Sequence, residues 1–444
     1  MERAFALKLM ELALRKGADE AEVYAKWSKS LGIEVKGQKI DTLESSTTVG
    51  YCIRVIKAKR LGFSYSTDPD EMDRVAEAAV EAAEYTEPDE SLGLPSHCKP
   101  SEVAIFDTAI SSLPEQDAID HVMLIEKTAF DEDRRIRRVR KAAGYFGAGD
   151  TYIVNSKGVD IHYASTGCSA QITVIAEEDG ESQMGWDYEG SRFLQDLSFE
   201  RVGRKGARRA LQLLGAKKIT PLRGFVLLDN SIASEFLGIF ATALSSESVQ
   251  KKKSMLAGKK GAQVASAGIN IIDSGLLAGR LGSKPADDEG VPTSSKVLIE
   301  RGVLNGYLYN TYTARKEGVS STGNAVRGGA ASLPLVGPTN LYCEPAGPEY
   351  LSDFSGLLKT IDRGLYVIET MGMHTANPIS GEFSVGASGL WVEKGEITYP
   401  VKEAVISGNI LDLFKNISKV GDDLRFYGNI GSSSLLIEGV DISG

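Results

Sequence analysis

Asp287, Asp288 and Glu289 place three carboxylates side by side, directly before the turn-like segment Gly290-Val291-Pro292-Thr293. Clustered carboxylates raise one another's pKa, so such a group can bind a cation or transfer protons. One loop alone does not match the EF-hand spacing of calcium ligands. The same carboxylates could instead cap turns by accepting backbone N–H groups. The sequence favours this structural role, and the three residues are candidate binding residues only under the first reading.

His374 lies in a second polar segment, Gly372-Met373-His374-Thr375-Ala376-Asn377-Pro378, with Glu382 a short distance further on. His374 and Glu382 could act as an acid–base pair if the loop folds back on itself. Ser380 and Ser384 lie nearby in sequence, but neither is identifiable as a nucleophile. A histidine in a glycine-rich loop is more often a surface or hinge residue, so the pair are weak catalytic candidates. His374 is also a candidate binding residue.

Recognised linear motifs for nucleotide or metal chemistry do not occur in the sequence. It contains no G-x-x-x-x-G-K-[ST], no H-E-x-x-H and no G-x-S-x-G. The glycine-rich segment 144–149 falls inside a series of predicted strands, and we interpret it as a turn. The cysteines and histidines are too widely spread for a disulfide framework or a linear zinc site: Cys52, Cys98, Cys168, Cys343, His97, His121, His162 and His374.

The elements of the first half alternate helices with strand series. Hydrophobic periodicity and cap residues predict helices over about 2–16, 69–85, 115–130 and 196–214. The predicted strands cover 21–27, 32–36, 40–44, 49–57, 60–66, 135–146, 150–155, 159–166, 169–177 and 181–188. Residues 86–114 contain four prolines and form a linker. This half is therefore predicted to consist of antiparallel sheets flanked by helices, in segments 1–86 and 115–215.

Glycine distinguishes the second half, because 30 of the 47 glycines lie in residues 222–444. That density indicates many tight turns and short strands. Hairpins are predicted around Arg301-Gly302, between 295–300 and 303–309, and around Lys394-Gly395, between 389–393 and 396–401. The remaining predicted elements are a strand at 224–228, helices at 231–245 and 409–420, and a strand at 433–441. The overall class is α+β, with domains 1–221 and 222–444.

Charge and composition limit the possible partners. The sequence has 50 Lys and Arg against 60 Asp and Glu, a net charge of −10, whereas duplex binding normally requires an excess of cations. The basic run 134–141 follows three acidic residues and is interpreted as a salt-bridged strand edge. No apolar run reaches the roughly 20 residues of a membrane span, and no signal peptide is recognisable. We expect a cytoplasmic protein that binds neither nucleic acid nor membranes.

Several segments resemble the PmbA/TldD family, which is named for gyrase modulation and also classed as a peptidase family. The matching segments are GADEAEV at 17–23, DDEGVPT at 287–293, STGNA at 321–325, ISGEFS at 379–384, GLWVE at 389–393 and SGN at 407–409. They follow the family's order through nearly the whole chain and are densest after residue 220.

The resemblance implies one of two branches. TldD-like members carry H-E-x-x-x-H and a downstream cysteine as metal ligands, whereas TldE-like members, also called PmbA, lack them. Here Gly238 and Ala243 occupy the histidine places, Ile239 the glutamate place, and Gly431-Ser432-Ser433 the cysteine region. Because zinc needs three ligands of His, Glu or Cys type, we expect no metal in this chain and zinc only in a TldD-like sister subunit.

The resemblance therefore implies a TldE/PmbA-like subunit that pairs with a TldD-like metalloprotease acting on peptides or unfolded proteins. An extended peptide could add to a sheet edge, with the acidic loop and His374 lining the cleft. Two alternatives stay open. One is a self-sufficient non-metal peptidase that uses His374, Glu382 and a serine, and the other is a homodimeric peptide-binding protein.

A subunit without its own catalytic groups needs a surface that binds a partner. Lasting interfaces bury more than roughly 1,000 Å² of accessible surface. We expect a dimer, formed with the sister or with a second copy, through the hairpins at Arg301-Gly302 and Lys394-Gly395. Trp391, Tyr307 and Tyr309 are of the aromatic types enriched in interface cores. The alternative places these three side chains in the chain's own core.

Overall fold

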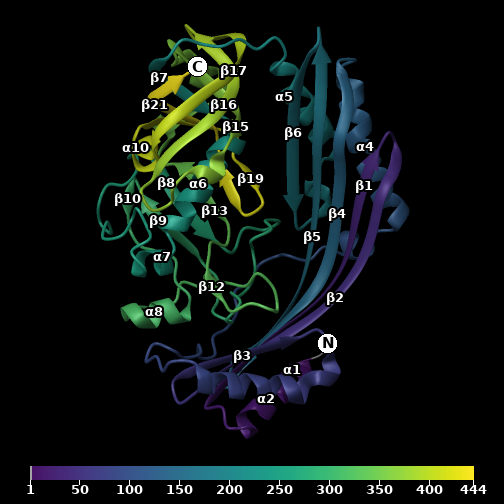
Figure 1. Ribbon diagram of the computed structural model, residues 1–444, viewed down its shortest axis with the longest axis vertical. Coiled ribbons are helices and arrows are strands. Elements are labelled where there is room, and N and C mark those ends of the chain that lie inside the picture. The colour runs from purple at the N-terminus through teal and green to yellow at the C-terminus, as the bar shows by residue number, and fades with distance from the viewer. Residues whose placement is uncertain (1–2) are drawn as a thin grey trace.

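The computed structural model describes residues 3–444. Its first half builds one six-stranded antiparallel sheet with the strand order β3-β2-β1-β4-β5-β6. The strands are β1 (Glu20–Lys36), β2 (Lys39–Lys57), β3 (Arg60–Ser66), β4 (Ile136–Asn155), β5 (Asp160–Glu178) and β6 (Glu181–Ser191). Because β1 pairs with β4, the segments on either side of the linker share this sheet, which we call the N-terminal sheet. Figure 1 shows its strands bending alongside the rest of the molecule.

Helices cover the outer face of the N-terminal sheet in two groups. At one end α1 and α2 bury Leu9, Val75 and Ala79 against the sheet, and at the other α4 and α5 bury Val122, Ile125 and other apolar residues. The helices are α1 (Arg3–Arg15), α2 (Met72–Ala82), α3 (Thr108–Ser111), α4 (Glu115–Glu132) and α5 (Phe199–Gln212), with 3-10 turns η1 (Pro69–Glu71), η2 (Ala83–Tyr85) and η3 (Leu194–Asp196). The predicted helix start at residue 2 lies outside the described residues.

The long strands differ from the prediction, which divided them into shorter pieces. Segment 144–149, interpreted as a turn, lies inside β4 and pairs with both β1 and β5. Its glycines permit close packing: a Cβ on Gly144 would lie 2.4 Å from Val122, and one on Gly149 would lie 2.3 Å from the Trp27 carbonyl oxygen. Glycine within a strand can thus mark close approach of a neighbour rather than a chain reversal.

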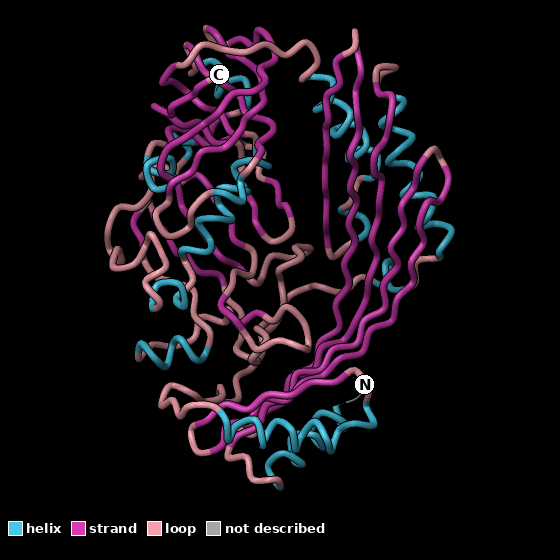
Figure 2. The backbone as a smooth tube through the Cα atoms, viewed as in Figure 1, coloured by secondary structure: helices cyan, strands magenta, loops and turns pink. Residues whose placement is uncertain are grey.

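The C-terminal half contains two further sheets around a shared core. One sheet has the order β10-β9-β8-β13-β20-β19 and the other β14-β18-β21-β17-β16-β15-β7. The first contains β8 (Ile269–Ser274), β9 (Ser295–Glu300), β10 (Val303–Leu304), β13 (Leu341–Pro345), β19 (Arg425–Tyr427) and β20 (Ile430–Ser432). The second contains β7 (Leu222–Leu228), β14 (Leu351–Ser352), β15 (Arg363–Met371), β16 (Glu382–Glu393), β17 (Glu396–Asn409), β18 (Ile417–Gly421) and β21 (Leu435–Ser443). Figure 2 shows strands, helices and long loops in this half, and the strands contain more residues than the helices, which confirms the predicted α+β class.

Helix α6 (Asn230–Ala243) contacts strands of both C-terminal sheets, including β15 and β20. Its side chains Ile232, Phe236, Leu237 and Phe240 belong to the large core between them. The other elements are α7 (Ser246–Gln250), α8 (Thr311–Glu317), α9 (Phe354–Lys359), α10 (Ile410–Lys415), η4 (Pro348–Tyr350), η5 (Met373–Thr375) and the two-stranded pair β11 (Ala325–Val326) and β12 (Leu335–Val336). None of the helices within residues 3–444 combines the length and the apolar character that a membrane span requires.

Two predicted elements of this half are wrong. The helix predicted over 409–420 ends at Lys415, because Ile417 and Val420 are buried and β18 pairs with β14 and β21. The second arm of the hairpin at Arg301-Gly302 is a strand only over Val303–Leu304. In both places tertiary contacts override the local pattern.

Candidate functional site

The resemblance noted in the sequence places the H-E-x-x-x-H position on α6, and this helix has one accessible face. Glu235, Gly238, Ile239 and Thr242 recur at helical spacing and are at least partly exposed, whereas most of the helix is buried. A Cβ on Gly238 would meet no atom within 4 Å, so this face has free space in front of it. The backbone at Gly238 therefore has room for a Cβ, and the sequence supplies glycine and isoleucine on this face.

The donor set at this position does not fit zinc. Gly238, Ile239 and Ala243 carry no side-chain nitrogen, oxygen or sulfur, and Ala243 is fully buried. The region aligned with the cysteine ligand lies in and after β20, where Ser432 and Ser433 are also buried and Ser432 Oγ donates to the Ser433 carbonyl. Among residues 3–444, no three His, Cys, Asp or Glu side chains form a group that could hold a metal ion.

Polar side chains around α6 are engaged with one another. Glu235 accepts a hydrogen bond from Thr370 Oγ1 at 2.8 Å, and burial raises its pKa. Asp229 caps the helix by accepting from the Ser231 amide and pairs with Arg209 of α5. The chemistry available on this face is thus a single carboxyl group that its neighbours already hold.

The acidic loop connects β8 to β9 and is buried, with Asp287 and Glu289 fully inaccessible. Asp287 accepts three backbone N–H bonds, from Glu289, Val291 and Ala325, at 2.9–3.0 Å. Asp288 accepts from Lys284 Nζ at 2.8 Å and from the Arg327 amide at 2.7 Å. These contacts agree with the favoured prediction, in which the carboxylates stabilise turns by accepting hydrogen bonds. Nearly every carboxylate oxygen has a donor from the chain itself.

Glu289 extends this loop into a network of ion pairs with the N-terminal sheet. Its Oε1 accepts from Arg54 of β2 at 2.8 Å, and its Oε2 accepts from the Thr311 amide at 2.8 Å. Arg54 also donates to Glu22 of β1 at 2.8 Å, and Glu22 receives a second guanidinium from Arg327 at 2.7 Å. We call Glu22, Arg54, Glu289 and Arg327 the seam network, because it joins the N-terminal sheet to the C-terminal half.

Burial dominates the electrostatics of these carboxylates. It raises the pKa of Glu22, while Arg54 and Arg327 oppose that shift. For Asp287, burial and the neighbouring Glu289 carboxylate raise the pKa to about 7, against the effect of its backbone donors. Groups with raised pKa values often occur at functional sites, but ion-pair networks with structural roles raise them as well.

His374 and Glu382 lie apart from this network: His374 is in η5, between β15 and β16, and Glu382 is the first residue of β16. The loop does fold back, since the Asn377 amide donates to the Glu382 carbonyl at 2.9 Å, but both side chains are exposed. Within residues 3–444, no hydrogen bond or ion pair joins the two side chains, and neither has one to the acidic loop. The structure brings Asp287, Asp288 and Glu289 together and leaves His374 separate.

The aromatic side chains considered for a partner surface lie in the core. Trp391, Tyr307 and Tyr309 retain 3%, 5% and 6% exposure, and all three belong to the C-terminal core. Tyr307 Oη donates to the Leu256 carbonyl, and Tyr309 Oη donates to Glu317. The three side chains therefore lie in the chain's own core, which was the alternative to an interface, and they are not free to contact a partner.

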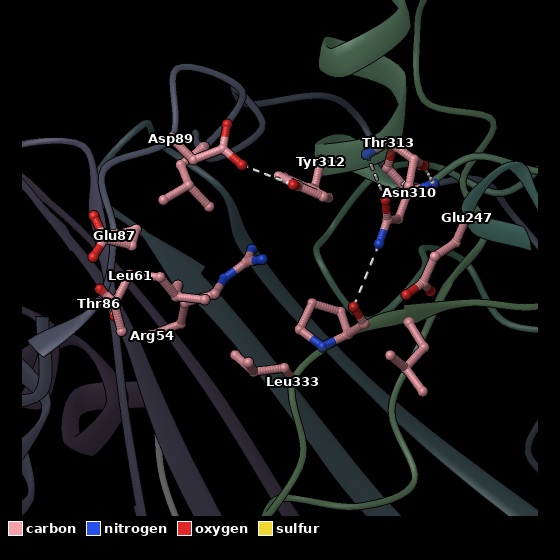
Figure 3. A pocket seen from close by; sticks show the side chains of 13 residues that line it. Arg54, Leu61, Thr86, Glu87, Asp89, Glu247, Asn310, Tyr312, Thr313 and Leu333 are labelled. Carbon is pink, nitrogen blue, oxygen red and sulfur yellow. Dashed lines mark hydrogen bonds between the residues drawn. The ribbon is translucent and has the colours of Figure 1, made fainter. Parts of the chain in front are cut away.

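A cavity of about 360 Å³ lies where the linker meets the C-terminal half (Figure 3). Leu61, Leu92, Leu333, Pro334 and Leu335 supply apolar surface to it. Arg54 reaches its wall, and the Tyr312 hydroxyl donates to Asp89 across the seam at 2.7 Å. The cavity suits an apolar group, and its Tyr312 hydroxyl is already engaged with Asp89.

Two more cavities, of about 580 and 420 Å³, lie between the N-terminal sheet and the C-terminal half. Segments 189–192, 278–284 and 422–429 contribute different residues to each, so the two cavities are neighbours along the same three segments. We call them together the interdomain groove. Arg425 of β19 closes one side of it with two hydrogen bonds to Asp187 of β6, at 2.8 and 2.7 Å.

Sequence reasoning missed the seam network and the groove. One signal was present: Arg54 is the single charge in the apolar run Tyr51–Ile56, all of which is buried. A buried arginine requires carboxylate partners, so this position could have been marked for pairing. The partners themselves, Glu22 and Glu289, could not have been named, because 235 residues separate Arg54 from Glu289.

Family models match the chain in three consecutive parts. They are PmbA/TldA metallopeptidase domain 1 over residues 21–83, the central domain over 109–214 and the C-terminal domain over 223–444. The chain is 32% identical to metalloprotease PmbA of Escherichia coli O157:H7, covering 98% of this chain and 94% of that protein. It is 28% identical to the metalloprotease TldD homolog of Haemophilus influenzae, covering 94% and 88%.

Solved structures show the same fold. A Thermotoga maritima protein, described as a candidate modulator of a DNA gyrase, superimposes with a TM-score of 0.91 at 30% identity and covers 99% of both chains. TldE from Thermococcus kodakarensis superimposes with a TM-score of 0.89 at 23% identity, covering 99% of this chain and 100% of that one, which is a likeness of fold alone. Together with the three consecutive family domains and the 32% identity to PmbA across nearly the whole length, these likenesses lead to one conclusion: the chain belongs to the PmbA/TldD family.

Proposed function

We propose that this chain is the TldE/PmbA-like subunit of a peptidase that acts on peptides or unfolded proteins in the cytoplasm. In this proposal the chain contains no metal centre of its own and works in complex with a TldD-like metalloprotease. The sister subunit supplies the zinc and the water that zinc activates. This chain supplies a binding surface.

The observation that carries the proposal is the accessible face of α6. Gly238 and Ile239 stand on a partly exposed helix face with free space before it, where a family metalloprotease would present ligands. Neither residue can bind a metal or transfer a proton. The fold is therefore kept while the ligand atoms are missing, as expected for a subunit whose partner performs the chemistry.

The position of the interdomain groove supports a role in peptide binding. It lies beside β6, the edge strand of the N-terminal sheet, and an edge strand offers backbone groups to an extended peptide. Main-chain hydrogen bonds of this kind supply affinity with little dependence on sequence, which suits unfolded substrates. The seam network holds the two walls of the groove together.

The test is reconstitution. The purified chain is dialysed and analysed for zinc by plasma mass spectrometry, and its cleavage of a fluorogenic unstructured peptide is measured. The TldD-like sister from the same genome is then added, and complex formation is followed by sedimentation. We expect no stoichiometric zinc and no cleavage for the chain alone, and a mixed complex that cleaves the peptide and loses this activity with a chelator.

Three outcomes would contradict the proposal. About one zinc per chain after dialysis would show a metal site formed by other residues. Metal-independent cleavage by the isolated chain would favour the self-sufficient peptidase, and substitution of His374 or Glu382 would then locate it. A stable homodimer that binds peptides and ignores the sister would favour the homodimeric binding protein.

A further inference from the structure

The smaller cavity of the interdomain groove, of about 420 Å³, is lined by an excess of positive charge. Lys26, Arg192, Lys284 and Arg327 line it, against one carboxylate, Asp288. We call it the cationic cavity. Strands β1, β4 and β5 form one wall, and C-terminal loops form the other. The larger neighbouring cavity differs, since its cationic and acidic side chains are equal in number.

Arg192 is held by the chain without a counter-ion. Its guanidinium donates to the carbonyl oxygens of Thr166, Leu281 and Ser283, at 2.9, 2.5 and 3.3 Å. Carbonyl groups orient the guanidinium but do not neutralise its charge, and burial lowers its pKa. Within residues 3–444, no carboxylate forms an ion pair with it. The positive charge is thus placed rigidly at the cavity wall.

Lys26 directs a second uncompensated cation into the same cavity. Glu22, Tyr24 and Lys26 are every second residue along β1, so their side chains share one face of the sheet. This is the face that meets the C-terminal half. Its side chain is accessible from the cavity and, among the described residues, has no hydrogen bond or ion pair. Burial lowers the pKa of Lys26, the nearby Asp288 carboxylate raises it, and Arg192 and Lys284 lower it, so these charged groups lie close together.

The other charges of the cavity are already satisfied. Lys284 pairs with Asp288 at 2.8 Å, and Arg327 pairs with Glu22 at 2.7 Å. Asp288 also accepts from the Arg327 amide, so both of its carboxylate oxygens have donors from the chain, and its charge offsets only part of the positive charge of the cavity. Two cations in a partly desolvated cavity attract an anion more strongly than the same charges in bulk water.

We propose that the cationic cavity binds a peptide carboxylate, with Lys26 and Arg192 as the charged contacts. This inference deepens the proposed function, on which it rests, because it assigns a chemical group of the substrate to one end of the groove. The C-terminal carboxylate of an extended peptide fits best, since the peptide can then continue into the larger cavity with balanced charge. Tyr24, Val326 and Leu281 supply the apolar surface against which the last side chain would pack.

The experiment compares matched peptides on the intact chain by fluorescence anisotropy. The probe is an unstructured peptide of neutral residues, labelled at its N-terminus, made once with a free C-terminal carboxylate and once as the carboxamide. A third peptide carries the carboxamide and a glutamate as its last residue, which separates a side-chain carboxylate from the terminal one. Charge-assisted hydrogen bonds are roughly twice as strong as neutral ones, so we expect the free acid to bind at least about tenfold more tightly than the amide.

Lys26→Met is the decisive variant, because within residues 3–444 the Lys26 side chain makes no hydrogen bond or ion pair whose loss would disturb folding. Lys29→Met is its matched control, with the same change of charge on the opposite face of β1. Lys26→Met is expected to reduce the preference for the free acid to below about threefold, and Lys29→Met to leave it intact. Arg192→Lys, which keeps a positive charge, should weaken binding less than Lys26→Met.

Equal binding of all three peptides would overturn the inference, as would full discrimination by Lys26→Met. Competition by inorganic phosphate that displaces both peptides equally would also overturn it, because it would show a general anion site. If only the glutamate peptide binds tightly, the carboxylate site stands and its source is a side chain. Failure of the chain to join the sister, with discrimination intact, would refute the proposed function while leaving the cationic cavity established.

Discussion

Arg54→Met tests whether the seam network holds the two halves of the molecule together. Arg54 is 7% exposed and donates to Glu22 and Glu289 through different nitrogens. Methionine has a similar apolar stem, so the variant removes the charge and leaves much of the packing. Among the partners described in residues 3–444, Glu289 then retains the Thr311 amide and Glu22 retains Arg327.

The expected cost follows from burial. Removing one partner of a buried ion pair costs about 3–5 kcal/mol, because the remaining charge stays desolvated. Counting the two lost hydrogen bonds to charged groups at about 1.5–3 kcal/mol each leads to a similar sum. Arg74→Met is the control, since Arg74 pairs with Glu71 at the surface and is 69% exposed. Exposed pairs contribute only about 0.2–1 kcal/mol.

Urea unfolding of the three proteins measures the difference, with tryptophan fluorescence and circular dichroism as parallel probes. We expect Arg54→Met to lose about 3–5 kcal/mol of unfolding free energy and to become sensitive to proteolysis in the linker at 86–107. The double variant Arg54→Met/Glu289→Gln should lose less than the sum of the single variants, because a neutral amide at position 289 leaves no stranded charge there. A loss for Arg54→Met within about 1 kcal/mol of Arg74→Met would refute the reasoning.

Three further outcomes are expected. The pKa of Asp287 is raised to about 7 in the folded chain, above the unfolded value near 3.9. The contribution of Asp287 therefore makes the free energy of unfolding fall as pH rises from about 4 to 7. Asp287→Asn should flatten this part of the profile of urea midpoint against pH, and an unchanged slope would contradict the expectation. Gly149→Ala should cost about 1–3 kcal/mol by overpacking against the Trp27 carbonyl, whereas Gly306→Ala, with no atom within 4 Å, should cost much less in the same melts. His374→Ala should leave peptide cleavage by the mixed complex within about twofold, because the side chain is exposed and unpaired with Glu382; a loss above tenfold would restore it as a catalytic residue.

Most of the local structure, and the family, could be predicted from the amino-acid sequence. Cap residues and periodicity predicted the helix over about 69–85, which contains α2, and the strands predicted over 49–57 and 60–66 lie in the β2–β3 hairpin. These signals depend on neighbours within a few residues, so no tertiary information was needed. The missing ligand atoms at Gly238, Ile239 and Ala243 were also readable directly, because they follow from residue type alone.

What these elements build together became visible only in three dimensions. The structure showed that segment 144–149 is part of β4, that residues 417–421 form a strand and that Tyr307 and Trp391 lie in the core. It also brought Arg54 to Glu289 and Lys26 to Arg192, across separations for which no local pattern exists. Burial and charge pairing depend on the whole chain, since the free energy of a buried charge is set by the atoms that surround it rather than by its neighbours in sequence.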